Sequence, residues 1–262
     1  AKKFAQVKRY GLEGAEAMMP LLDALLHAAA RAGGSHVVLG MPHRGRLNLL
    51  TGLLKYPLPA LFHKMKGASE IPPGVRGSGD VLSHLATSVD LSYDGRLLHV
   101  ALMHNPSHLE AIAPVAAGKA RAKQAAVGDA ARQRVLALLV HGDAAVAGQG
   151  VIAESVAMSA LPGYAVGGAL HLVLNNQLGF TTDPALARSA RYASDAAKLS
   201  DSPAVHVNAE APELAVLAAR VAVDYRQRFR RDVWLDLVGY RRWGHNELDE
   251  PAFTQPLMYK SK

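Results

Sequence analysis

The chain has 262 residues, of which 50% are hydrophobic, and it carries a formal net charge of +7 with no cysteine. A chain of this length can bury one sizeable core, and the lack of cysteine excludes disulfides and thiolate metal sites. No apolar stretch reaches the ~18 residues of a membrane span and no signal peptide is recognisable, so we expect neither a membrane protein nor a secreted one.

Helical patterns and short apolar runs alternate along the chain. A helix is predicted over 18–29, where apolar residues recur at helical spacing, and Gly33 and Gly34 end it. An alanine-rich helix is predicted over 109–126 and another helix over 213–229. The last of these places four apolar residues along one stripe: Leu214, Leu217, Val221 and Tyr225.

Six runs rich in valine and leucine are predicted strands: 36–40, 97–103, 135–140, 170–174, 204–207 and 233–238. Runs without polar alternation are typical of strands buried on both faces. We therefore predict an α/β fold with a mostly parallel sheet and helices on both faces. Residues 1–262 are expected to form a single domain, cut from a longer chain, with a mobile loop over 67–79.

The basic net charge raises the possibility of a nucleic-acid partner. However, the basic residues are scattered and only 6% of the chain is aromatic, so there is no basic stripe with stacking side chains. Anionic small molecules, or simply a solvated basic surface, explain the sign of the charge equally well. We expect no nucleic-acid partner.

Polar residues gather where the predicted strands end. Ligands bind at the carboxyl ends of strands in sheets of this type. Five of the six predicted strands are followed by polar segments: 41–48, 104–108, 141–145, 175–180 and 240–247. Packing alone does not explain such clustering, so this edge of the sheet is the predicted site.

Two of these segments predict a metal site. Asp143 follows one strand, and Asn176 follows the next strand 33 residues later. One crossover fits in that interval, so both side chains are expected at one sheet edge. Carboxylate and amide oxygens suit Mg²⁺, and a helix predicted to begin over 147–150 would favour an anion. Each motif alone is an ordinary turn, but their joint spacing indicates a diphosphate bridged by Mg²⁺.

The segment from Gly142 and Asp143 to Asn175 and Asn176 resembles the thiamine diphosphate motif, with Ala144 where a glycine usually stands. This variant resembles the first components of 2-oxoglutarate and 2-oxoadipate dehydrogenases, and the similarity runs from residue 8 to residue 260. The most specific blocks are 40–48, 105–110, 141–150, 175–182 and 244–247. The resemblance implies the diphosphate-binding domain of the thiamine diphosphate-binding fold.

The resemblance also implies roles for individual residues on the cofactor side. The side chains of Asp143 and Asn176 and the backbone carbonyl of Leu178 correspond to Mg²⁺ ligands. Ala144 lies in the cofactor-binding motif. Arg44 corresponds to a cofactor contact, because its planar fork suits phosphate oxygens.

On the substrate side, His43 and His84 correspond to catalytic histidines that face the substrate and the thiazolium ring. The implied reaction is oxidative decarboxylation of a dicarboxylic 2-oxo acid, with acyl transfer to a lipoyl group on a partner acyltransferase. Family members are homodimers with a second, pyrimidine-binding domain, which nothing in this chain matches. We therefore expect this fragment to be inactive alone. The family implies the mitochondrial matrix in a eukaryote and the cytoplasm in a bacterium.

Tyr10 bears on the choice of substrate. It stands where the 2-oxoadipate type has tyrosine and the 2-oxoglutarate type has phenylalanine, and the segments 49–54 and 80–85 resemble the same type. A hydroxyl would add a donor for the distal carboxylate, so we expect 2-oxoadipate to be preferred over 2-oxoglutarate. The alternative is that Tyr10 is a packed aromatic whose hydroxyl faces water.

Other classes of protein fit this sequence less well. Relatives of transketolase and pyruvate dehydrogenase share the metal motif but lack the block 43–48. A non-catalytic binding module is opposed by the presence of Asp143, Asn176, His43 and His84 together. A binding protein that holds only Mg²⁺ and diphosphate remains the alternative function.

A histidine metal site is a further alternative. His104 and His108 have the spacing of neighbours on a helix. Pro106 lies between them and disfavours a helix there.

Overall fold

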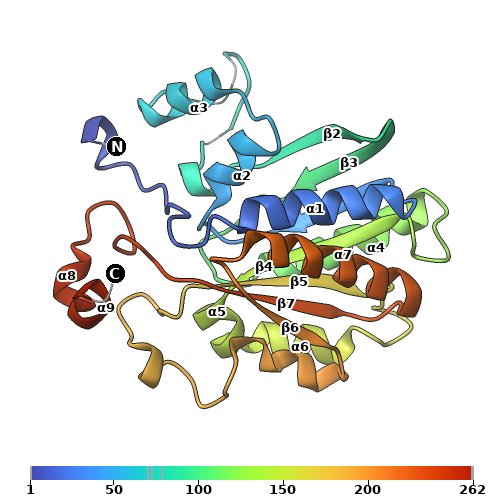
Figure 1. The fold of residues 1–262 in the computed structure, drawn as a ribbon. Coiled ribbons are helices and arrows are strands. Elements are labelled where there is room, and N and C mark those ends of the chain that lie inside the picture. The colour runs from blue at the N-terminus through green and yellow to red at the C-terminus, as the bar shows by residue number, and fades with distance from the viewer. Residues whose placement is uncertain (1, 70, 72, 78, 261–262) are drawn as a thin grey trace.

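The computed structural model describes residues 2–69, 71, 73–77 and 79–260 as an α/β sandwich built on a seven-stranded sheet (Figure 1). The strands are β1 (His36–Gly40), β2 (Thr87–Tyr93), β3 (Arg96–Leu102), β4 (Val135–Gly142), β5 (Ala169–Asn175), β6 (Ala204–Asn208) and β7 (Val233–Val238). The helices are α1 (Met18–Arg31), α2 (Arg46–Gly52), α3 (Leu58–Met65), α4 (Ile112–Ala126), α5 (Asp143–Gly148), α6 (Gly150–Met158), α7 (Pro212–Phe229), α8 (Pro251–Thr254) and α9 (Pro256–Lys260). The predicted fold class is confirmed.

The strand order is β2-β3-β1-β4-β5-β7-β6, and every neighbouring pair is parallel except β2 and β3. All six predicted strands are present. The prediction omitted β2, which forms a hairpin with β3 through Asp94 and Gly95. Its apolar residues alternate with polar ones, as expected of an edge strand, so it lacks the continuous apolar run that marked the other strands.

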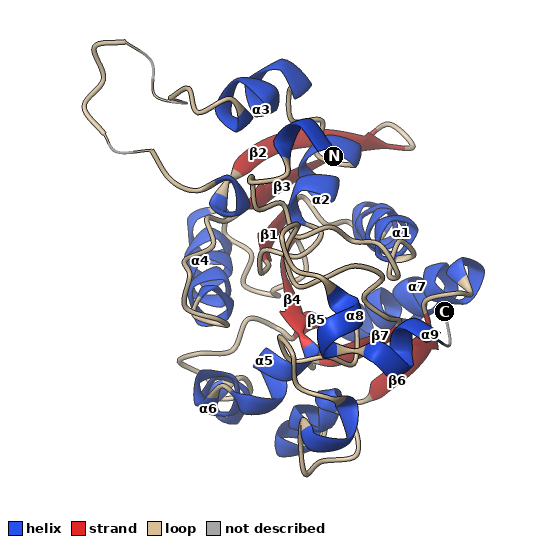
Figure 2. Cartoon of the chain, turned by 90° about the vertical axis from the view of Figure 1, so that its left-hand side faces the viewer, coloured by secondary structure: helices blue, strands red, loops and turns tan. Residues whose placement is uncertain are grey.

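Helices cover both faces of the sheet, as predicted. Figure 2 shows α1 and α7 on one side and α4 and α6 on the other. Successive residues of one strand enter different cores: Leu138 packs with the α1–α7 side, whereas Leu139 packs with the α4–α6 side. This two-sided burial explains why β4 is apolar at nearly every position.

Of the four residues in the predicted stripe on α7, Tyr225 packs against the core and the other three do not. Leu214, Leu217 and Val221 are each about half exposed, whereas Ala215, Ala218, Ala219, Ala222 and Val223 are buried. The alanine face lies against α1 and the sheet, where short side chains allow close approach of the backbones. The helix therefore has a second apolar face, made mostly of alanine, which the spacing of the larger side chains did not reveal.

The predicted loop over 67–79 contains no helix or strand among its described residues. Glu70, Pro72 and Ser78 lie outside the described residues, and the mobility of the loop stays a prediction. Of the helices that the structure describes, none is both long enough and apolar enough to cross a membrane.

Candidate functional site

A cavity of about 570 Å³ opens at the carboxyl edge of the sheet. We call it the candidate cavity. It is lined by residues from several strand exits, among them Tyr10, His43, His84, Asn105, Ala144 and His245. His43 follows β1, Asn105 follows β3 and Ala144 follows β4. The structure therefore brings together side chains from segments far apart in the sequence. This agrees with the prediction made from the polar segments that follow the strands.

An aromatic cluster forms one wall of the candidate cavity. The ring centroids of Tyr10 and His43 lie 4.2 Å apart, and those of His43 and His245 lie 5.7 Å apart. Burial, with a smaller effect of the Arg44 charge, lowers the pKa of His43 to about 3. Burial also lowers the pKa of His245 to about 4. Both imidazoles are therefore neutral at physiological pH.

His84 lies on a 3-10 turn, Leu82–His84, and also lines the candidate cavity. Its Nδ1 is 2.9 Å from Oδ1 of Asp80, and its Nε2 is 3.4 Å from Oγ of Ser107. An ionised carboxylate only accepts hydrogen bonds, so Nδ1 carries the proton and donates to Asp80. The other nitrogen, Nε2, contacts the Ser107 hydroxyl, and both residues line the cavity.

Asp143 and Asn176 lie side by side in the fold, each directly after the end of a strand. They follow β4 and β5, which are parallel neighbours with Gly142 beside Leu174. Both side chains are buried, as is that of Leu178. The sequence placed the next helix at 147–150, but α5 already begins at Asp143, and only α6 begins at Gly150. Asp143 is thus the first residue of a helix rather than part of a loop, because Gly142 adopts the extended backbone of a helix cap.

The oxygen atoms predicted to bind metal have the following neighbours. Oδ1 of Asn176 accepts a hydrogen bond from the backbone N–H of Leu178 at 3.0 Å. Oδ2 of Asp143 lies 3.4 Å from Nη1 of Arg188. Burial raises the pKa of the Asp143 carboxyl to about 6, and the Arg188 guanidinium partly offsets that effect. This side chain is a buried carboxylate that a cation would stabilise.

Arg44 does not line the candidate cavity. Its side chain donates hydrogen bonds to backbone carbonyls instead. Its two Nη atoms donate to the carbonyls of Gly11 at 2.9 Å and His245 at 2.8 Å. It lines a separate cavity of about 850 Å³ with Arg241 and Glu247. Arg44 joins the N-terminal segment to the segment that follows β7, and its predicted contact with phosphate stays a prediction.

Sequence reasoning did not single out Arg46, which is fully buried. Its guanidinium donates to the carbonyls of Leu85 at 2.7 Å and Met41 at 2.9 Å, and also to that of Met103. These carbonyls belong to the segments that carry His84, His43 and Asn105, respectively. Arg46 therefore links the three segments that carry His84, His43 and Asn105 and fixes their positions relative to one another. Its position in the block 40–48 was the only signal in the sequence.

Gly45 occupies a position in that block that favours glycine. Its φ is +72°, and an added Cβ would lie 2.8 Å from Cε of Met18 and 2.9 Å from Cδ1 of Leu12. Any other residue would be strained in this left-handed conformation, and the ends of these two side chains would have to move.

The alternative histidine site is not supported. His104 and His108 are exposed and lie outside helices. Across the described residues, no three His, Cys, Asp or Glu side chains gather so as to hold a metal ion. A metal in this part of the chain would need amide or backbone oxygens, which the Asp143–Asn176 pair offers.

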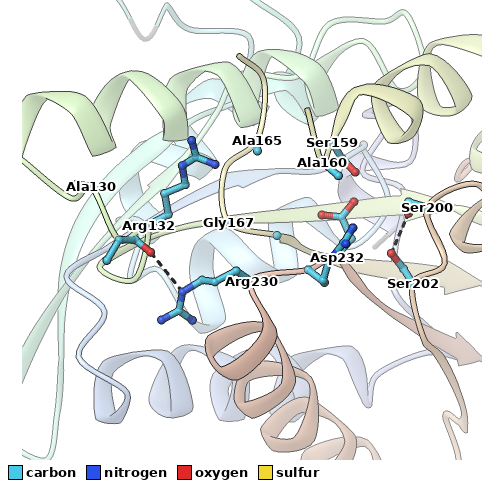
Figure 3. A pocket seen from close by; sticks show the side chains of 13 residues that line it. Ala130, Arg132, Ser159, Ala160, Ala165, Gly167, Ser200, Ser202, Arg230 and Asp232 are labelled. Atoms are coloured by element: carbon cyan, nitrogen blue, oxygen red, sulfur yellow. Dashed lines mark hydrogen bonds between the residues drawn. The ribbon is translucent and has the colours of Figure 1, made fainter. Parts of the chain in front are cut away.

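A third cavity, of about 350 Å³, lies at the opposite edge of the sheet (Figure 3). Its lining residues precede the strands: Arg132 precedes β4, Gly168 precedes β5 and Asp232 precedes β7. None of the residues predicted from the sequence lines this cavity. The chemistry predicted for the chain therefore belongs to the carboxyl edge.

Comparison with known proteins gives consistent matches along the whole chain. Residues 1–262 match the family described as dehydrogenase E1 component. The chain is 52% identical to the 2-oxoadipate dehydrogenase complex component E1 of Rattus norvegicus and 51% identical to its probable homolog in Dictyostelium discoideum, each over 99% of this chain and 29% of the relative.

The 2-oxoglutarate dehydrogenase E1 component of Brucella ovis is 50% identical over 99% of this chain and 27% of the relative. The chain thus spans about three tenths of the length of the curated relatives that it matches. Overall identity is nearly the same for the two kinds of relative, so identity alone does not separate their substrates.

Proposed function

This chain belongs to the dehydrogenase E1 component family, and on that premise we propose that it binds thiamine diphosphate through Mg²⁺. We propose further that it forms part of an enzyme that oxidatively decarboxylates a dicarboxylic 2-oxo acid. The observation that carries the proposal is the position of Asp143 and Asn176 at the ends of neighbouring parallel strands, beside the cavity that holds His43 and His84.

The residues present fit the proposed metal. Mg²⁺ prefers hard oxygen ligands and completes its coordination with phosphate oxygens and water. Asp143 would supply a carboxylate, Asn176 an amide oxygen and Leu178 a backbone carbonyl. The amide oxygen of Asn176 already accepts one hydrogen bond and keeps a second lone pair for a metal. The burial of the Asp143 carboxylate favours a cation at this place.

When bound, thiamine diphosphate supplies the electron sink that makes loss of carbon dioxide feasible. The chain's own residues bind and orient the substrate. His43 is neutral and can donate one N–H to a carboxylate or carbonyl oxygen. His84, held by Asp80, presents Nε2 to the cavity and can give or take a proton there.

We propose 2-oxoadipate rather than 2-oxoglutarate as the preferred substrate. Tyr10 lines the candidate cavity beside His43, where its hydroxyl can serve as a donor to the distal carboxylate. The two acids differ by one methylene, a difference that is worth only ~1–3 kcal/mol of discrimination. One well-placed donor is therefore enough to shift the preference.

We also propose that these 262 residues are one diphosphate-binding domain of a longer, homodimeric protein, since the relatives are more than three times as long. A pyrimidine-binding domain elsewhere would complete the site, so these residues alone are expected to show no turnover. The proposed partner is a lipoyl-bearing acyltransferase, because the names of the matched 2-oxoadipate relatives describe complex components. The compartment stays a prediction from the family.

Calorimetric titration of thiamine diphosphate into the full-length protein with Mg²⁺ tests this proposal. Asp143→Ala should abolish measurable binding, because the metal bridges the protein and the diphosphate. Glu154→Ala is a matched control, since that carboxylate is exposed on the nearby helix α6. Unchanged affinity in Asp143→Ala would contradict the assigned site. Normal binding without turnover of any 2-oxo acid would favour a protein that only holds Mg²⁺ and diphosphate.

A further inference from the structure

Arg188 covers the carboxylate that we propose as a metal ligand. Its Nη1 lies 3.4 Å from Oδ2 of Asp143, although the two residues are 45 positions apart in the chain. The Asp143 side chain is only 3% exposed and that of Arg188 is 15% exposed. The guanidinium therefore stands between the buried carboxylate and solvent.

The two partners come from different parts of the fold. Asp143 begins α5 at the buried end of β4, whereas Arg188 lies in the segment 181–192 that follows the Asn176–Leu178 turn. Most of that segment is exposed, and its Leu186 side chain is 82% exposed. Moving the Arg188 side chain away from Asp143 would therefore leave the packing of the sheet and its helices unchanged.

A divalent cation and the guanidinium make conflicting demands on one carboxylate. Mg²⁺ binds its oxygen ligands at about 2.0–2.1 Å and requires near-octahedral room around it. A guanidinium at 3.4 Å from the same carboxylate occupies part of that room and adds a positive charge that repels the metal. Both cations stabilise the buried carboxylate, so each reduces the gain from the other.

We propose that Arg188 is a built-in counter-ion for the metal site, which competes with the divalent cation for Asp143 and must release that carboxylate when the metal binds. This inference rests on the proposed function, because it takes Asp143 to be a metal ligand. Arg188 is then a positioning residue that sets metal affinity, not a catalytic residue. Without metal, it prevents the site from being an uncompensated buried charge.

The test measures metal affinity rather than activity. Mn²⁺ serves as the probe, and its binding to the full-length protein is followed by electron paramagnetic resonance with saturating thiamine diphosphate. The pH is kept well above the value of about 6 that burial gives the pKa of Asp143, so that the carboxylate is ionised in every variant. Competition predicts that Arg188→Gln binds Mn²⁺ more tightly, on the order of 10-fold, a typical size for coupling between two ligands.

Two further variants separate charge from other effects. Arg188→Lys keeps a cation in place and should stay close to the wild type. Arg191→Gln is the matched control, because Arg191 belongs to the same segment but lies over the Tyr192 ring, 5.3 Å from its centroid. It should leave Mn²⁺ affinity unchanged.

The outcomes distinguish this inference from the proposed function. If the wild type does not bind Mn²⁺, or if Asp143→Ala binds it normally, the assigned metal site is wrong and both proposals fall. If binding requires Asp143 but Arg188→Gln binds Mn²⁺ no more tightly than the wild type, only the competition by Arg188 is overturned. Equal tightening in Arg191→Gln would show a general charge effect and would likewise overturn it.

Discussion

Tyr10 and His43 pack ring against ring in the candidate cavity, with their centroids 4.2 Å apart and their planes tilted by 55°. The contact joins the N-terminal segment to the exit of β1. Tyr10 also adopts a φ of +50°, a conformation that is uncommon for a residue with a side chain and that its surroundings must maintain. The backbone conformation and the contact with His43 together hold the Tyr10 ring at the cavity wall.

Tyr10→Phe is expected to lower the ratio of kcat/KM for 2-oxoadipate to that for 2-oxoglutarate, because it removes only the hydroxyl. The loss of one hydrogen bond from a hydroxyl to a charged carboxylate is worth about 1.5–3 kcal/mol, which corresponds to roughly 10- to 160-fold in the ratio. Steady-state kinetics of both acids with the full-length protein measures it. A ratio that does not move would mean that Tyr10 is a packed aromatic without a role in specificity.

His84→Ala is expected to lower kcat/KM for the 2-oxo acid by ~10²-fold or more, while thiamine diphosphate affinity stays close to the wild type. The reason is that His84 lines the cavity with its Nε2 beside Ser107, another lining residue, whereas its Nδ1 is held by Asp80. His99→Ala serves as a control, because that histidine pairs with Asp90 on the β2–β3 hairpin. A parallel fall in turnover and cofactor affinity would instead make His84 a cofactor-binding or structural residue.

Cofactor binding should depend on pH through Asp143. Its pKa is raised to about 6, and only the ionised carboxylate binds metal, so protons compete with Mg²⁺ as the pH falls through that value. Below it, apparent affinity should decrease about tenfold per pH unit. His43 and His245 titrate lower, near 3 and 4, and stay neutral across this window.

Calorimetry of the wild type and Asp143→Asn over the same pH range separates this effect from titration of the cofactor itself, which both proteins share. The steeper dependence should belong to the wild type. Parallel curves for the two proteins would mean that Asp143 does not control binding.

Arg46→Met is expected to destabilise the full-length protein by about 3 kcal/mol or more, since it leaves buried carbonyls of Met41, Leu85 and Met103 without a donor. Chemical denaturation followed by circular dichroism measures the loss. Arg132→Met is a suitable control, because that arginine is only partly buried at the opposite edge of the sheet. A small effect at Arg46 would mean that water or a shifted side chain replaces its hydrogen bonds.

Sequence patterns predicted most of the sheet and the neighbouring positions of Asp143 and Asn176 for a clear physical reason. Strands buried on both faces leave continuous apolar runs, and their carboxyl ends collect ligand-binding residues, so the neighbouring positions of Asp143 and Asn176 followed from spacing. The strand β2 was missed because an edge strand shows only alternation.

The sequence alone could not predict which distant segments contact one another. The pairing of Arg188 with Asp143 and the three carbonyls gathered by Arg46 depend on how loops fold over the sheet edge. Similarly, nothing in the spacing of Leu214 and Ala215 showed which face of α7 would meet the core. Those choices are made by packing between elements rather than by local pattern.

The most direct test of the central claim is release of carbon dioxide by the full-length protein supplied with thiamine diphosphate and Mg²⁺, compared for 2-oxoadipate, 2-oxoglutarate and pyruvate. We expect both dicarboxylic acids to be decarboxylated, 2-oxoadipate with the higher kcat/KM, and pyruvate to be a poor substrate. Pyruvate used as well as the dicarboxylic acids, or no release of carbon dioxide from any of the three, would contradict this expectation.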